Sequence, residues 1–108
     1  MSTYLISYNI ENNGSLYFKK HKNLRILIKE LFPSCCHPLD SSWMIDSPLS
    51  ANEIRDSLSD GLETKDRLLI VEVGQVAWKG IINGSGEWLR KQADTSNASL
   101  HNYNMSFG

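Results

Sequence analysis

The sequence YLISYNI at residues 4–10 decides the fold, because every later segment is expected to pair with this stretch or to cover it. It is rich in aromatic and β-branched residues, which favour β-strands. The Glu-Asn-Asn-Gly run at 11–14 has the composition of a loop and ends the strand. Asn9 is therefore a polar residue at a strand end, a position where a metal-using enzyme would carry an acid.

The size and charge of the chain set limits on its function. Its 108 residues are enough for one domain with its own core, and its apolar fraction of 41% is ordinary. The formal charge of −1 means that nucleic-acid binding would need a local cluster of basic residues. The adjacent cysteines Cys35 and Cys36 suit neither a disulfide framework nor a zinc site. No signal peptide or membrane span is apparent, so we expect a cytoplasmic protein without a membrane partner.

The order of the predicted elements indicates the fold class. After the first strand come a helix at 17–32, strands at 36–38 and 42–46, a helix from about 51 to 60, and a strand at 67–73. Ser50 and Glu53 form a capping box that begins the second helix, and Pro38 restricts its strand to a sheet edge or a strand end. This order predicts an α+β, ferredoxin-like βαββαβ fold, with a four-stranded antiparallel sheet and two helices on one face.

The C-terminal part is expected to add a short strand at 76–81 and a helix at 84–92. Residues 1–92 then form a single domain. Residues 93–108 are rich in Ser and Asn with little charge, so we expect a flexible tail.

Alternation along each strand predicts which residues share a face of the sheet. The helix-covered face is expected to carry Tyr4, Ile6, Tyr8, Ile10, Trp43, Ile45, Leu69, Val71 and Val73. The opposite, open face is expected to carry Leu5, Ser7, Asn9, Ser42, Met44, Asp46, Leu68, Ile70 and Glu72. A solvated face should not carry the four apolar residues of this second set together. We therefore expect the open face to meet a partner, most simply a second copy about a two-fold axis.

The first helix carries the densest positive patch, on the side opposite its apolar stripe. The patch consists of Lys19, Lys22, Arg25 and Lys29. A solvated helix face is one explanation of this cluster. A face that binds the phosphates of RNA or DNA is the other.

Three short motifs, in this order and spacing, resemble a known family. They are YLISYN at 4–9, SSWMID at 41–46 and DRLLIVEV at 66–73. The chain resembles the CRISPR-associated Cas-two proteins and the related VapD-type toxins, most of all a small branch labelled SinR-like. The resemblance covers about residues 3–92.

The resemblance implies a homodimer of ferredoxin-like folds in which strand-end acids of the two subunits face each other. In the family these acids are associated with a divalent metal and phosphodiester cleavage, whereas some members hold duplex DNA as a non-catalytic scaffold. Asn9 stands at the position of the acid. Metal-assisted cleavage would therefore be weakened unless Asp46 or another acid substitutes.

The catalytic candidates are Asn9, Ser42 and Asp46, and each has a plainer alternative. Asn9 is a metal ligand, a hydrogen-bonding residue at an interface, or a residue that ends a strand. Ser42 contacts a phosphate or is an ordinary strand-end serine, and Asp46 replaces the missing acid or shapes the following turn. No metal site is assigned, and only an active nuclease would need Mg²⁺.

These observations favour a homodimeric, nucleic-acid-associated protein that is weakly active or inactive as a nuclease. One alternative is a metal-dependent endonuclease acting on RNA or DNA. Another is a regulatory or protein-interaction domain, because the ferredoxin-like fold hosts many functions.

Overall fold

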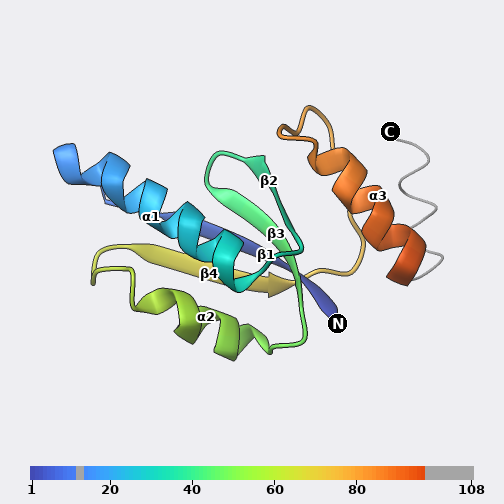
Figure 1. The fold of residues 1–108 in the computed structure, drawn as a ribbon, viewed down its shortest axis with the longest axis horizontal. Helices are drawn as coiled ribbons and strands as arrows, with labels where there is room; N and C mark the ends of the chain where they lie inside the picture. Colours follow the sequence, from blue (N-terminus) through green and yellow to red (C-terminus); the bar gives the residue numbers. More distant parts are fainter. Residues whose placement is uncertain (12–13, 97–108) are drawn as a thin grey trace.

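The computed structural model describes residues 1–11 and 14–96. In chain order the described elements are β1 (Ser2–Asn9), α1 (Ser15–Leu31), β2 (Cys35–Leu39), β3 (Ser42–Ser47), α2 (Ala51–Ser59), β4 (Arg67–Glu72) and α3 (Ser85–Ser96) (Figure 1). The strands form one four-stranded sheet in the order β2-β3-β1-β4, and each neighbouring pair is antiparallel. The predicted ferredoxin-like arrangement is confirmed.

Local sequence signals fix the ends of several elements. The Ser50 hydroxyl accepts a hydrogen bond from the Glu53 backbone N–H (3.2 Å), and the Glu53 carboxylate accepts one from the Ser50 N–H (3.0 Å). This is the predicted capping box, and it begins α2. Pro38 lies in the edge strand β2, in a stretch where the register with β3 shifts. A proline is tolerated there because an edge or a bulge does not need its missing N–H.

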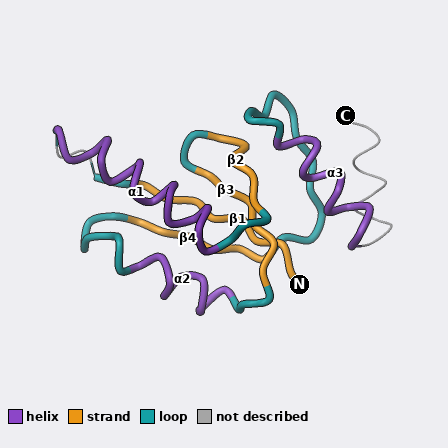
Figure 2. Tube along the Cα trace, viewed as in Figure 1, coloured by secondary structure: helices purple, strands orange, loops and turns teal. Residues whose placement is uncertain are grey.

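The main core lies between one face of the sheet and the helices α1 and α2, which run along the sheet in Figures 1 and 2. Its buried residues are Tyr4, Ile6, Tyr8, Ile10, Leu24, Ile28, Phe32, Trp43, Ile45, Ile54 and Leu58. The two-helix layer predicted from the sequence is therefore present.

The faces of β4 are the reverse of those predicted. Leu68 pairs with Tyr8 and Ile70 pairs with Ile6, so both lie on the helix-covered face, because directly opposed residues share a face. Leu69 is 59% exposed on the other face, and Val71 is 41% exposed. The segment is apolar at every one of these positions, so alternation alone does not identify its inner side. The register with β1 decides it.

The second face of the sheet is partly covered by the chain itself. Leu89 of α3 packs on Cys36 and Met44, and these three residues are buried. Leu5 and Trp88 also join this smaller cluster. The prediction of a face left open for a partner is therefore wrong at the β2–β3 side, where α3 lies next to β2 (Figure 1). The part around Leu69 and Val71 remains exposed.

The C-terminal elements differ from the prediction in two ways. No strand forms at 76–81, which is part of an irregular connection between β4 and α3 within the described residues. The helix α3 is present but runs to Ser96, so it takes in the first residues of the predicted tail. Residues 97–108 of that tail lie outside the described residues.

Candidate functional site

The three predicted catalytic residues do not come together within one subunit. Ser42 lies opposite Ser7, with the hydroxyl oxygens 3.5 Å apart, and Asn9 follows two residues further along β1. Asp46 lies opposite Thr3, near the other end of β1. A strand rises by about 3.3 Å per residue, so Asp46 and Asn9 are separated by roughly 20 Å. Ser42 and Asn9 share one end of the sheet, but Asp46 cannot replace a missing acid there.

The immediate neighbour of Asn9 across the sheet is a cation. Asn9 pairs with Arg67 of β4, and both residues are exposed. On the β3 side, the Tyr8 N–H donates to the Ser41 carbonyl oxygen (3.1 Å), which brings the β2–β3 turn and Asp40 to this strand end. A shallow hollow of about 240 Å³ lies here, lined by Ser7, Tyr8, Asn9, Arg67, Leu68 and Leu69.

The hollow at this strand end does not fit the Mg²⁺ that the resemblance implies, because no carboxylate is among the residues that line it. Magnesium sites in proteins rely on carboxylates, whereas Asn9 contributes only a neutral amide and faces the positive charge of Arg67. Among the described side chains, no group of three or more His, Cys, Asp or Glu residues has the arrangement of a metal site. Within one subunit, the residues around Asn9 therefore do not support a metal-dependent step.

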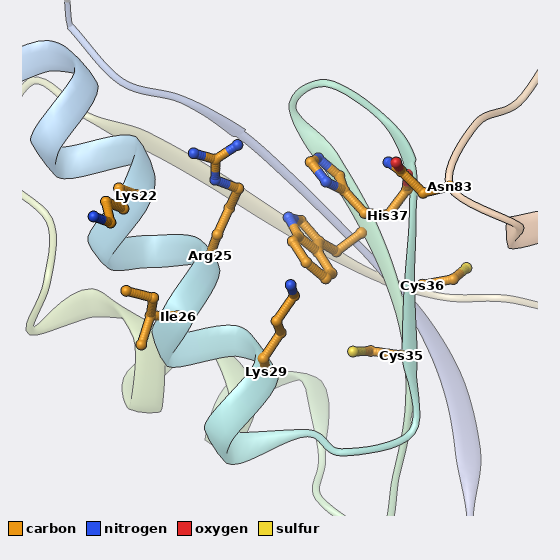
Figure 3. Close-up of a pocket in the computed structure, with 9 residues that line it drawn as sticks. Lys22, Arg25, Ile26, Lys29, Cys35, Cys36, His37 and Asn83 are labelled. Atoms are coloured by element: carbon orange, nitrogen blue, oxygen red, sulfur yellow. The ribbon is translucent and has the colours of Figure 1, made fainter.

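A basic groove lies between α1 and β2 (Figure 3). Lys22, Arg25 and Lys29 share one face of α1 because they are three and four residues apart. Lys19 is exposed but does not line the groove. The groove has a volume of about 540 Å³ and is lined by Lys22, Arg25, Ile26, Lys29, Cys35, Cys36, His37, Trp43 and Asn83. The structure thus brings together three of the four basic residues predicted for this face.

The opposite wall of the groove is shaped by an irregularity in β2. Cys36 pairs with Met44, but Leu39 pairs with Ser42, so one extra residue of β2 lies between these pairs. Such a bulge redirects the side chains next to it. His37 and Trp43 are the next residues after the Cys36–Met44 pair on the way to the hairpin turn, so they lie opposite each other. The imidazole of His37 lies on the Trp43 ring, with the centroids 4.2 Å apart and an angle of 5° between the planes.

Three hydrogen bonds hold this ring pair in place. His37 Nε2 lies 3.0 Å from the Asp40 carbonyl oxygen, and Nε2 must be the donor because a carbonyl only accepts. The Asn83 side-chain amide donates to the His37 carbonyl oxygen (2.8 Å). Below the pair, Trp43 Nε1 donates to the Tyr8 hydroxyl (3.3 Å). Trp43 is only 2% exposed, so the partly exposed His37 is the ring that the groove presents to solvent.

The groove is locally positive although the whole chain is nearly neutral. No carboxylate among the described side chains forms a salt bridge with Lys22, Arg25 or Lys29. Lys29 Nζ lies 5.9 Å from the centroid of the Trp43 ring, within the range of a cation–π contact. Lys20 differs from these three, because its Nζ is 2.7 Å from the Asp66 carboxylate. The three cations of the groove are therefore available to an anionic ligand.

Neither thiol at the groove is activated as a nucleophile. Burial raises the pKa of the Cys36 thiol to about 11, and burial also raises the pKa of Cys35 despite the nearby Lys29. In Figure 3, Cys35 points toward α1 and Cys36 points away from it. Burial likewise raises the pKa of the Tyr8 phenol, against the opposing effects of the Trp43 hydrogen bond and Arg25. The arrangement is suited to binding rather than to nucleophilic catalysis.

Sequence reasoning missed His37, Asn83 and Arg67 as site residues. The two-residue turn Asp40–Ser41 contains a signal for His37, because a hairpin closed there brings His37 close to Trp43. The position of Arg67 follows only from the β1–β4 register. No local signal locates Asn83, which reaches His37 across an irregular connection.

Comparison with models of protein families and with curated proteins gives no match to this chain. In the part of the chain that the structure describes, no helix combines the length and the apolar character needed to cross a membrane.

Proposed function

We propose that this chain forms a Cas-two-like homodimer that binds RNA or DNA and has weak or no nuclease activity. The observation that carries the proposal is the basic groove, where Lys22, Arg25 and Lys29 face His37 across about 540 Å³ of open space. Phosphate contacts by clustered Lys and Arg residues are the main source of affinity for nucleic acids. A cytoplasmic location agrees with the free thiols of Cys35 and Cys36.

Nucleic-acid binding is tested by fluorescence anisotropy with end-labelled single-stranded RNA, single-stranded DNA and duplex DNA at low salt. The wild-type protein is expected to bind at least one of them. The triple variant Lys22→Ala/Arg25→Ala/Lys29→Ala is expected to lose most of this affinity, because the groove then has no cation on α1. Lys65→Ala is the matched control, since Lys65 is an exposed lysine outside the groove. Equal binding by the triple variant would overturn the proposal.

The homodimer is supported by the apolar residues that α3 leaves uncovered. Leu69 and Val71 lie side by side on the second face of β4 and are 59% and 41% exposed. A second copy of the chain is the simplest partner for such a surface, because two-fold dimers use the same patch on both subunits. Asn9 lies at the end of this same face, so a dimer formed here would bring the two Asn9 residues toward the interface.

The dimer is tested by light scattering coupled to size-exclusion chromatography. Wild-type protein is expected to be dimeric, and Leu69→Glu/Val71→Glu is expected to be monomeric, because charges at these positions would face each other across the contact. Phe18→Glu is the control, since Phe18 is 75% exposed on α1. A monomeric wild-type protein at every concentration would refute the dimer but would leave nucleic-acid binding by the groove intact.

The weak or absent nuclease activity is inferred from Asn9. The family acid is absent at this position, Arg67 lies opposite, and Asp46 is at the far end of the strand pair. A protein with this arrangement is better suited to hold a nucleic acid than to cleave it through a bound metal.

A further inference from the structure

We propose that His37, supported by Trp43, is a base-stacking subsite, and that the basic groove consequently selects single-stranded nucleic acid over duplex. This inference rests on the proposed nucleic-acid binding and adds the form of the ligand and the residue that recognises it. The ligand class is a single-stranded polynucleotide, RNA or DNA, because both present the same unpaired bases and phosphates.

The first argument is the rigidity of the ring. One face of the His37 imidazole is covered by the parallel Trp43 indole, 4.2 Å away between centroids. Its Nε2 is bonded to the Asp40 carbonyl oxygen at 3.0 Å, and its own carbonyl oxygen accepts a bond from Asn83 at 2.8 Å. A second bond, from the Ile82 N–H to the Pro38 carbonyl oxygen at 3.1 Å, ties the same connection to β2. These contacts fix the orientation of the imidazole in the free protein, before a ligand binds.

The second argument is the direction of the free face. His37 belongs to the edge strand β2, and Trp43 lies on its inner side in β3. His37 is partly exposed and lines the groove, and Trp43 covers one face of its ring. A base that enters the groove would therefore stack on the face opposite Trp43. A flat, uncovered ring of this kind accepts a nucleobase by stacking, whatever the base, because every base has a π-face.

The third argument is the position of the cations relative to this ring. Lys22 and Lys29 are seven residues apart on α1, which corresponds to about 10 Å along the helix axis. This length allows the α1 face to contact more than one phosphate of a strand whose base lies on His37. In Figure 3, Arg25, Lys29 and His37 border the same space from opposite sides. Stacking and phosphate contacts can therefore be made by one strand at the same time.

These arguments favour a single strand. In a duplex, each base is covered by its neighbours on both faces, so it cannot stack on a protein ring without leaving the helix. In a single strand, a base is free to stack, and aromatic platforms beside basic grooves are the usual means of binding such strands.

The deciding experiment compares four end-labelled ligands of equal length on the wild-type protein by fluorescence anisotropy. They are single-stranded RNA, single-stranded DNA, an abasic DNA strand with the same phosphates, and duplex DNA. At least one natural single strand is expected to bind about tenfold or more tightly than the abasic strand, which is the usual range for one stacked base. The duplex is expected to bind like the abasic strand. The RNA and DNA measurements show which polynucleotide is preferred.

Variants locate the effect at His37. His37→Ala is expected to lower the affinity for the natural single strand to that of the abasic strand, without changing the affinity for the abasic strand itself. His37→Phe keeps a flat ring without the imidazole nitrogens and is expected to retain most of the preference. If the alanine variant does not fold, the comparison of abasic and natural strands on wild-type protein still decides whether a base stacks on the protein, and an unchanged preference in His37→Phe agrees with stacking on the ring at position 37.

Two results would overturn the stacking subsite while leaving the proposed nucleic-acid binding intact. One is equal affinity for the abasic and the natural single strand. The other is a duplex that binds as tightly as the single strand. If none of the four ligands binds at low salt, the proposed function fails, and this inference fails with it.

Discussion

The imidazole of His37 lies parallel to the indole of Trp43, with centroids 4.2 Å apart and planes 5° from parallel. The two rings connect the core of the protein to its most basic surface, because Trp43 is buried against Tyr8 while His37 borders the groove beside α1. The shape of the groove therefore depends on contacts that also stabilise the fold.

The first prediction concerns the hydrogen bond beneath this ring pair. Tyr8→Phe removes the acceptor of the Trp43 Nε1–H and leaves a buried donor without its partner. We expect the free energy of unfolding to fall by about 1–3 kcal/mol, measured by urea denaturation. Tyr17→Phe is the control, with an expected change below about 0.5 kcal/mol. Equal effects of the two variants would show that the bond to Trp43 contributes nothing specific.

The second prediction concerns Asp66, which links three segments of the chain. Its carboxylate accepts hydrogen bonds from the Glu11 and Glu63 backbone N–H groups, each at 2.9 Å, and its Oδ2 lies 2.7 Å from Lys20 Nζ. Burial raises the pKa of Asp66, but these bonds outweigh burial, so the pKa lies below its ordinary value. Because the folded state lowers this pKa, the stability that Asp66 contributes is present above the unfolded pKa and is lost as the pH falls through the folded value.

Asp66→Asn is therefore expected to lower the urea midpoint at neutral pH, and the gap to wild type is expected to shrink below about pH 4. Asp56→Asn is the control, because the Asp56 side chain is 68% exposed and, among the described residues, its salt bridge is with its helix neighbour Arg55. If the difference in urea midpoint between Asp66→Asn and wild type stays constant from neutral to acidic pH, this account is contradicted.

The third prediction uses Cys36 to report on the packing of α3. Cys36 is buried with Leu89 and Met44, and burial raises the pKa of its thiol to about 11. In a Cys35→Ser background, Cys36 is expected to react slowly with a thiol reagent at neutral pH, because α3 must first move away. Leu89→Ala should accelerate the reaction by loosening that contact. If Cys36 in the Cys35→Ser protein, with Leu89 intact, reacts as fast as in the unfolded chain, α3 does not cover it.

The fourth prediction concerns metal-dependent cleavage. With Mg²⁺ or Mn²⁺ in place of EDTA, the protein is expected to cut single-stranded RNA and duplex DNA weakly or not at all. Asp46→Ala should leave any residual rate unchanged, because Asp46 pairs with Thr3 at the end of β1 remote from Asn9. Cleavage that requires metal, survives Asn9→Ala and disappears in Asp46→Ala would overturn the assignment of a weak or inactive nuclease.

The sequence predicted those parts of the fold whose signals are local. The capping box of Ser50 and Glu53, the edge position of the strand containing Pro38 and the basic face of α1 each follow from neighbouring residues, and the structure contains all three. A local pattern suffices in these cases because each interaction lies within a turn or two of chain.

The features that the sequence did not predict depend on distant pairing. The inner side of β4 is set by the pairing of Leu68 with Tyr8, since the strand itself is apolar on both sides. The packing of α3 on Met44 and the bond from Asn83 to the His37 carbonyl join segments more than forty residues apart. The hairpin turn at Asp40–Ser41 indicates that His37 lies close to Trp43, but the parallel stacking of the two rings is seen only in the structure.

The most direct test of the central claim is the salt dependence of single-strand binding by wild-type protein and by Lys22→Ala/Arg25→Ala/Lys29→Ala. Three phosphate contacts predict that the logarithm of the binding constant falls with the logarithm of salt concentration with a slope of about −2. The triple variant is expected to bind weakly and to lose most of that slope. Absence of binding by wild-type protein at low salt, or an unchanged slope in the triple variant, would contradict the claim that the basic groove holds nucleic acid.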